Sequence, residues 1–208
     1  MTTDNKIDLC KLHKDEYAMP KSPVLVTVGE GRYLTVTGRG KPGGPEFMDR
    51  IGALYGVAYT VKMTRKFSGL QDYVVCKLEG QWWVDDQCQD FARVPREQWN
   101  WRLMIRTPEI VTPAELHRAA DTLIEKGKAP NAGLVKLESF TEGLCVQSLH
   151  VGPYDRESET IARMQSFAAD NGLEFYGRHH EIYLSDPRRV APEKLKTILR
   201  IPARKAEA

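Results

Sequence analysis

The sequence predicts an α+β fold made of tandem βαββ units, with helices on one side of a mainly antiparallel sheet. The order strand, Gly-Pro loop, long helix, strand, strand occurs at about residues 32–106 and again from about residue 143. The long helices show one apolar face, and the strands are rich in β-forming residues. A pair of such units leaves a groove where they meet, so we expect a ligand cleft between the two halves.

The first half contains the longest predicted helix. A strand at 32–37 precedes a glycine-rich loop, in which Pro45 suits the first helical turn. Apolar residues then recur at spacings of three or four, which is typical of one helix face: Phe47, Ile51, Leu54, Ala58 and Val61. Two more strands are predicted, at 72–78 and 99–105.

Residues 107–142 are predicted to be an insertion with one helix. Thr112-Pro113-Ala114-Glu115 forms a capping box with proline in the first turn, and Gly127 ends the helix. A strand follows at 135–140.

The second half repeats the element order over residues 143–203. Its predicted elements are a strand at 144–149, a helix between Gly152-Pro153 and Asn171-Gly172, a strand within 178–187 and a last strand at 197–201. We therefore expect a single domain over residues 1–208, in which residues 1–30 form an N-terminal arm packed on the two halves.

Composition excludes several classes of protein. Hydrophobic residues make up 41% and charged residues 28%, and a net charge of +2 gives no electrostatic reason to expect nucleic acid or an anionic membrane as partner. No apolar run approaches the roughly 20 residues of a spanning helix, and the N-terminus lacks the apolar stretch of a signal peptide. Four scattered cysteines are predicted to be reduced thiols: Cys10, Cys76, Cys88 and Cys145. We expect a cytoplasmic protein.

The stretch Arg178–Pro187 carries the most chemistry. Side chains alternate along a strand, so Gly177, His179, Glu181 and Tyr183 share one face, and Gly177 is expected to leave room beside the other three. A carboxylate at mid-strand is unusual. Either this face is solvated, with Glu181 and His179 at the surface, or it forms a site. Because His179 and His180 point apart, they cannot bind one metal, and we expect neither metal nor cofactor.

Four tryptophans gather within a short part of the sequence: Trp82, Trp83, Trp99 and Trp101. They can fill the core, which is the favoured interpretation for any single tryptophan. Together with Tyr55, they could instead line a pocket for a flat apolar ligand. The glycine-rich loop fits neither a P-loop nor a dinucleotide-binding fingerprint.

Several motifs resemble the GyrI-like small-molecule-binding family over about residues 20–203. They are Gly40-Lys41-Pro42, Ala58-Tyr59-Thr60-Val61-Lys62, Leu78-Glu79-Gly80-Gln81-Trp82-Trp83, His150-Val151-Gly152-Pro153-Tyr154 and His180-Glu181-Ile182-Tyr183-Leu184-Ser185-Asp186-Pro187. The resemblance implies βαββ units of the SHS2 type with a ligand cleft between them. Relatives fused to DNA-binding domains sense lipophilic cationic drugs with a buried Glu that matches Glu181.

Stand-alone relatives include hydrolases that open the cyclopropane of flat DNA-alkylating compounds, and in these Glu181 and Tyr183 match the catalytic pair. The sequence contains no DNA-binding domain, so we expect such a hydrolase, as a monomer or weak homodimer. The expected ligand-binding residues are Tyr55, Trp82, Trp83, Trp101 and His179. The alternative is a non-catalytic protein that binds or sequesters lipophilic drugs, including cationic ones.

Overall fold

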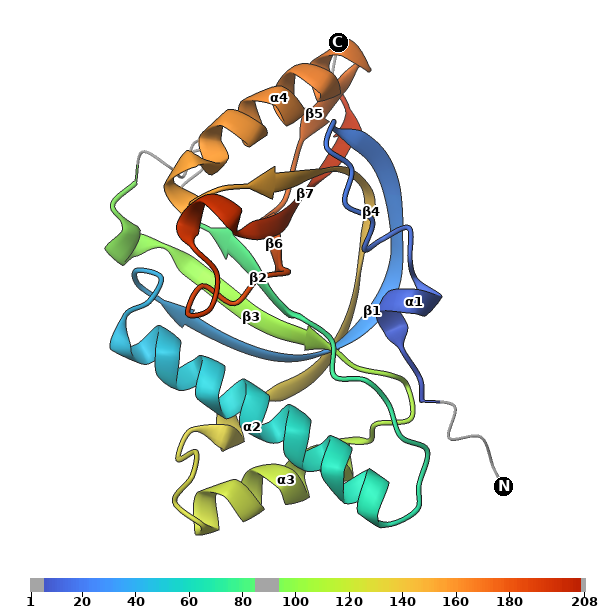
Figure 1. Cartoon of the computed structure of the whole chain (residues 1–208), viewed down its shortest axis with the longest axis vertical. Helices are drawn as coiled ribbons and strands as arrows, with labels where there is room; N and C mark the ends of the chain where they lie inside the picture. The colour runs from blue at the N-terminus through green and yellow to red at the C-terminus, as the bar shows by residue number, and fades with distance from the viewer. Residues whose placement is uncertain (1–5, 85–93, 207–208) are drawn as a thin grey trace. The chain divides into compact units, whose positions relative to one another are not determined.

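The computed structural model describes residues 6–84 and 94–206, so Cys88 and the first five residues of the predicted arm lie outside the described residues. Helices and strands follow in the order α1 (Leu9–Leu12), β1 (Val24–Arg39), α2 (Pro45–Phe67), β2 (Leu78–Trp83), β3 (Asn100–Arg106), α3 (Pro113–Glu125), β4 (Lys136–Val151), α4 (Glu157–Asp170), β5 (Leu173–Phe175), β6 (His179–Tyr183) and β7 (Lys196–Lys205) (Figure 1). The fold is mixed, with a mainly antiparallel sheet and four helices within the described residues.

The chain divides into two compact units. The first unit contains the described residues of Met1–Leu12, Gly31–Cys76 and Trp82–Phe140. The second unit contains those of His13–Glu30, Lys77–Gln81 and Thr141–Ala208. Three strands, β1, β2 and β4, therefore contribute residues to both units.

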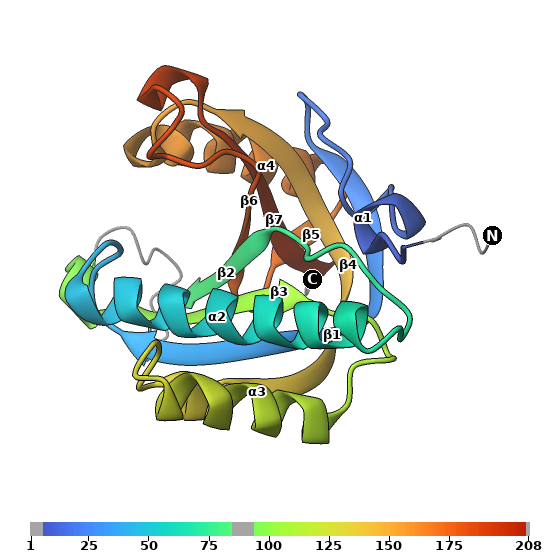
Figure 2. The same ribbon diagram turned by 60° about the horizontal axis from the view of Figure 1, so that its bottom comes forward.

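The first unit has strands in the order β4-β1-β3-β2, and β1 pairs antiparallel with β3 from Tyr33 opposite Arg106 to Arg39 opposite Asn100. Helix α2 packs against β3 and lies beside α3 (Figure 2). The predicted apolar face of α2 is confirmed at four of its five positions, because Phe47, Leu54, Ala58 and Val61 are buried while Ile51 is half-buried.

The capping box that opens α3 is also confirmed. The Glu115 backbone N–H donates to Thr112 Oγ1 at 3.3 Å, and the Thr112 backbone N–H donates to Glu115 Oε2 at 2.8 Å. These bonds satisfy two backbone N–H groups that the first helical turn would otherwise leave without a partner.

The second unit is organised around β7. This strand pairs antiparallel with β4, β5 and β6, and α4 packs against β5. The buried core of this unit comprises Val146, Met164, Ala168, Leu199, Ile201 and Ala203. Met164 and Ala168 lie four residues apart on α4, which is the spacing that places side chains on one helix face.

The strand predicted at 72–78 is wrong. Residues in this stretch make only an isolated parallel bridge, between Ile7 and Tyr73, and the strand begins at Leu78. The reason lies in Asp72, whose carboxylate accepts the Tyr73 backbone N–H at 2.8 Å and lies 3.2 Å from Lys62 Nζ. Such a local side-chain bond competes with a strand ladder for the backbone donor.

The two strands predicted at 135–140 and 144–149 form one continuous strand, β4. Gly143 adopts a left-handed φ of +74° within it, so the break predicted between residues 140 and 144 is accommodated inside the strand. Strand β1 is likewise longer than predicted, because it begins at Val24, inside the predicted arm. Helix α1 and strand β5 are too short to show a periodic pattern and were not predicted.

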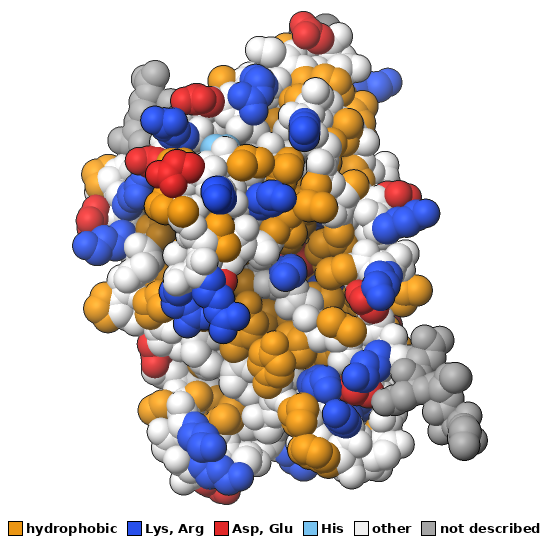
Figure 3. Space-filling view, in the orientation of Figure 1, with side chains coloured by type: hydrophobic (Ala, Val, Ile, Leu, Met, Phe, Trp, Pro, Cys, Tyr) orange, Lys and Arg blue, Asp and Glu red, His pale blue; other side chains and the backbone are white. Residues whose placement is uncertain are grey.

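No helix among the described residues is long and apolar enough to cross a bilayer. On the face shown in Figure 3, Lys and Arg side chains are scattered among Asp and Glu side chains and do not form a single basic band. This distribution agrees with the small net charge of +2.

Candidate functional site

Strand β6 presents its side chains with the period of two that the sequence predicted. His179 Nε2 lies 3.2 Å from Glu181 Oε1, which places both side chains on one face. Gly177 does not share that face, contrary to the prediction. Its left-handed φ of +79° puts it outside the strand, which begins at His179.

Glu181 and His179 are buried, with exposed fractions of 8% and 5%. A solvated face, with both residues at the surface, is therefore excluded. Taking a carboxylate out of water costs several kcal/mol unless it gains a partner. The His179 imidazole lies 3.2 Å away, so the carboxylate has a close partner in a largely dry environment.

A second carboxylate, that of Glu157, joins this pair. Glu157 is the first residue of α4, and one ligand atom from each of Glu157, His179 and Glu181 lies within 4.8 Å of the others. Two carboxylates and an imidazole are groups that can hold a divalent cation. The separation of 3.2 Å between His179 Nε2 and Glu181 Oε1 suits two ligands of a tetrahedral ion with bonds of roughly 2 Å.

Two phenols lie next to this group. The rings of Tyr183, on β6, and Tyr154, just before α4, meet edge to face with centroids 6.1 Å apart. Burial and then the negative charge of Glu181 raise the pKa of Tyr154 to about 12. The Tyr154 hydroxyl therefore stays protonated at neutral pH and can donate a hydrogen bond. Tyr154 and Glu157 were not among the predicted site residues, because only the fold brings them to β6.

The opposite face of β6 carries a buried network around His180. His180 Nδ1 lies 2.8 Å from Glu142 Oε1, and His180 Nε2 lies 3.1 Å from Glu79 Oε2. Arg200 Nη1 donates to Glu142 Oε2 at 2.9 Å, and the Tyr17 hydroxyl donates to Glu79 Oε1 at 2.8 Å. The histidine pair of β6 is thus split between two environments, in agreement with the prediction that the two side chains point apart.

Charges within this network compensate one another. Burial on its own would lower the pKa of His180, but the Glu142 carboxylate, followed by Glu79, outweighs burial and raises it to about 9. Burial would raise the pKa of Glu142, but His180 and Arg200 outweigh it and lower the pKa to about 2. His180 is therefore an imidazolium at neutral pH, and we assign it to structure rather than to chemistry.

Two of the predicted ligand-binding tryptophans pack inside the first unit. Trp101 is completely buried and meets Phe47 edge to face, with ring centroids 5.3 Å apart. Trp82 is 3% exposed and stacks on the same Phe47 at 5.6 Å. Both indoles fill the core of that unit, which is the role favoured for a single tryptophan.

The other two aromatic residues are more accessible. Tyr55 is half-buried and stacks on exposed Tyr59, with ring centroids 6.1 Å apart. Trp83, at the end of β2, is also half-buried. Ligand binding by Tyr55, Trp82, Trp83 and Trp101 stays a prediction.

Residues 21–204 match the family model described as the GyrI-like small molecule binding domain. The search of curated proteins found no match. Among solved structures, an uncharacterized conserved protein from Listeria innocua is 40% identical, with a TM-score of 0.88, over 96% of this chain and 100% of that one.

A hydrolase from Listeria innocua is 39% identical, with a TM-score of 0.85 and the same coverage of both chains. The C-terminal domain of EcmrR is 12% identical, with a TM-score of 0.55, over 89% of this chain and 98% of that domain, and it shows likeness of fold alone. Because the family model spans nearly the whole sequence, the chain belongs to the family of GyrI-like small molecule binding domains.

Proposed function

We propose that this small-molecule-binding protein is a hydrolase of flat hydrophobic compounds, and that it opens the cyclopropane ring of cyclopropanoid DNA-alkylating compounds by adding water. The observation that carries the proposal is the buried Glu181 carboxylate, held 3.2 Å from His179, with the phenols of Tyr183 and Tyr154 nearby. The hydrolase from Listeria innocua, 39% identical over nearly the whole chain, supports catalysis over binding alone.

The reaction would need a base for water and a donor for the developing oxyanion. Glu181 would take a proton from water as the oxygen attacks the strained ring carbon. The carbon–carbon bond of the ring then breaks, and its electron pair moves into the conjugated carbonyl. Tyr183 would donate its hydroxyl proton to that oxygen, and the proton taken up by Glu181 would then return to Tyr183, so the product is the substrate plus one water. His179 would hold the Glu181 carboxylate in place.

Stacking would fix the plane of the ligand. Tyr55 and Trp83, both half-buried, stay the proposed stacking residues of the first unit. Trp82 and Trp101 would not contact the ligand directly, because both are buried packing partners of Phe47. His179 would not contact the ligand itself but would act through Glu181, which it contacts.

A second candidate function is binding without turnover. The negative charge of Glu181 and Glu157, which lie together near Tyr154, favours a lipophilic cation as ligand. In that case Glu181 would neutralise the ligand and perform no chemistry.

The test is turnover of a cyclopropanoid compound, followed by mass spectrometry as the gain of one water. Glu181→Gln and Tyr183→Phe keep the shape of the side chains and remove the proposed base and donor. We expect both variants to bind the compound and to lose turnover by at least about 100-fold, the usual contribution of a positioned acid or base. The matched control is Glu174→Gln, which changes a carboxylate of β5 that pairs with Arg204.

Turnover of both variants within a few-fold of the parent would refute the proposed pair. A parent protein that quenches its tryptophan fluorescence on binding but leaves the compound intact would establish the binding function instead.

A further inference from the structure

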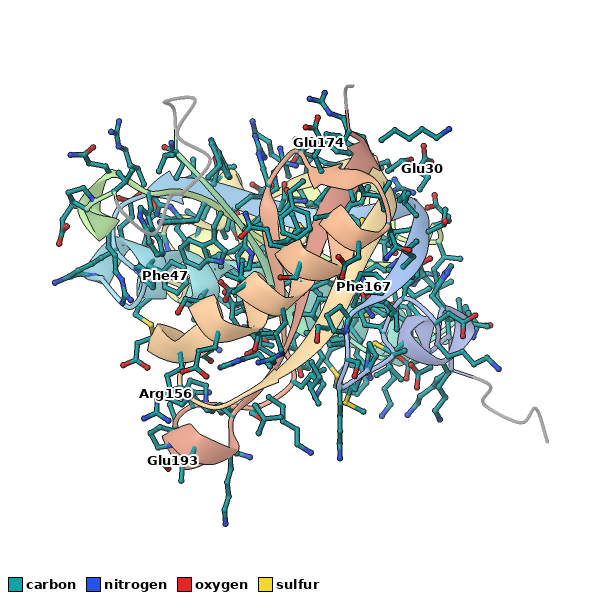
Figure 4. The ribbon with its side chains drawn as sticks, turned by 90° about the horizontal axis from the view of Figure 1, so that it is seen from above. Glu30, Phe47, Arg156, Phe167, Glu174 and Glu193 are labelled. Carbon is teal, nitrogen blue, oxygen red and sulfur yellow. The ribbon has the colours of Figure 1, made fainter. Side chains whose placement is uncertain are left out.

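The second unit contains a cavity of about 350 Å³ that none of the proposed catalytic residues lines. Its walls come from the end of β4, the first half of α4, the segment before β1 and the turn before β7. Figure 4 shows two of the lining residues, Arg156 and Glu193, near the same end of α4. The volume lies at the lower end of the range for small-molecule sites.

Three cationic side chains line this cavity: Lys21, Arg156 and Arg163. Arg156 is the N-cap residue just before α4, and Arg163 lies in the second turn of that helix, so both come from its N-terminal half. Within the described residues, none of the three forms an ion pair with a carboxylate. Two carboxylates, Glu159 and Glu193, also line the cavity. The cationic groups therefore outnumber the anionic groups by one.

A chain of hydrogen bonds links the exposed Arg163 side chain to buried Thr160 and His150. Arg163 Nη2 donates to Thr160 Oγ1 at 3.0 Å, and Thr160 Oγ1 lies 3.0 Å from His150 Nδ1. His150 Nε2 lies 3.1 Å from the Pro153 carbonyl oxygen. A carbonyl only accepts, so the neutral imidazole carries its proton on Nε2, and Nδ1 accepts the hydroxyl proton of Thr160. His150 and Thr160 are 4% and 2% exposed.

This chain leaves the remaining N–H groups of the Arg163 guanidinium for another partner. A planar guanidinium binds a carboxylate or a phosphate through two parallel hydrogen bonds. One nitrogen held by a buried hydroxyl restricts the orientation of the fork and reduces the entropy lost on binding. Glu159 and Glu193 can accept hydrogen bonds from hydroxyl groups of the same ligand.

We propose that this cavity is a second binding site, which takes a small hydroxylated organic anion through a phosphate or carboxylate group. Arg163 and Arg156 bind the anionic group, with Lys21 contributing charge, and the two glutamates bind the hydroxyl groups. The cavity shares no residue with the group of Glu157, His179 and Glu181, so this inference does not depend on the proposed hydrolase activity.

The experiment is calorimetric titration of the full chain with glycerol 3-phosphate and with citrate, at an ionic strength held constant with sodium chloride. We expect saturable binding of at least one of them to the parent. Arg163→Met should weaken that binding at least tenfold. Thr160→Val keeps every charge but breaks the chain to His150, and it should weaken binding several-fold. The matched control is Arg188→Met, an exposed arginine of the same unit that pairs with Asp186.

Circular dichroism and the melting temperature establish that each variant is folded before it is titrated. Absence of saturable binding to the parent by both compounds would overturn the proposal. Equal loss of affinity in Arg163→Met and Arg188→Met would also overturn it, because binding would then follow general surface charge. Unchanged affinity in Thr160→Val would show that this chain of hydrogen bonds does not position Arg163.

Discussion

At the scale of single residues, two adjacent histidines of β6 have different partners. His179 lies against Glu181, whereas His180 lies between Glu142 and Glu79 and is completely buried. The alternation of a strand is enough to predict this separation. This alternation does not predict which residues contact each face, because Glu142 and Glu157 come from other elements of the second unit.

The Glu157–His179–Glu181 group allows a direct test of whether a metal takes part. In the proposed mechanism Glu181 acts on water itself, and His179 lies 3.2 Å from its carboxylate. Dialysis against EDTA should therefore leave turnover of the cyclopropanoid compound unchanged, and Glu157→Gln should keep most of it. Loss of turnover after chelation, restored by Zn²⁺ or Mn²⁺, would instead make the three side chains metal ligands.

At the scale of elements, the sequence pattern predicts helices better than strands. The period of α2 and the capping box of α3 are local signals, and both elements lie where they were expected. The ends of β1, β2 and β4 depend on Asp72, on Gly143 and on pairing with distant strands, so the pattern missed them. For the same reason Tyr154 was not predicted to belong to the site, because its contact with Tyr183 joins two elements.

The pairing of β1 with β3 makes one glycine essential. Gly38 stands opposite Trp101, and a Cβ built on Gly38 would lie 2.2 Å from the indole ring. Because the completely buried Trp101 packs against Phe47, the ring cannot move without disturbing the core. Gly38→Ala should lower the free energy of unfolding by about 1–3 kcal/mol, as overpacked substitutions do.

Urea unfolding followed by tryptophan fluorescence measures this change. The control is Gly29→Ala in the same strand, where a Cβ would meet nothing within 4 Å. We expect that substitution to change the free energy of unfolding by less than about 0.5 kcal/mol, as surface changes usually do. Equal effects of the two alanines would contradict the close packing of Gly38 on Trp101.

At the scale of the whole molecule, the network around His180 links stability to pH. It joins Glu79 of β2, Glu142 of β4, His180 of β6 and Arg200 of β7, all within the second unit. Two carboxylates face an imidazolium and a guanidinium, so the buried charges cancel. Removing a proton from His180 leaves an uncompensated buried negative charge, which is costly in a dry interior.

The sign of the pH dependence follows from the two shifted groups. The pKa of His180 rises from 6.5 to about 9 in the folded protein, so its contribution to stability is complete below pH 6.5 and is lost as pH rises through 9. The pKa of Glu142 falls from 4.5 to about 2, so its contribution is present above pH 4.5 and is lost as pH falls through 2. Between about pH 4.5 and 6.5, both contributions are present.

We therefore expect the free energy of unfolding to fall by on the order of 3 kcal/mol between pH 6.5 and pH 9. Urea unfolding at a series of pH values measures this fall. Titration of the histidine ring resonances by NMR assigns it, because the imidazole of His180 should stay protonated at pH 8. Glu142→Gln removes the main cause of the raised pKa, so its stability should depend less on pH in this range. A His180 ring that loses its proton near pH 6.5 would show that the network does not hold an imidazolium.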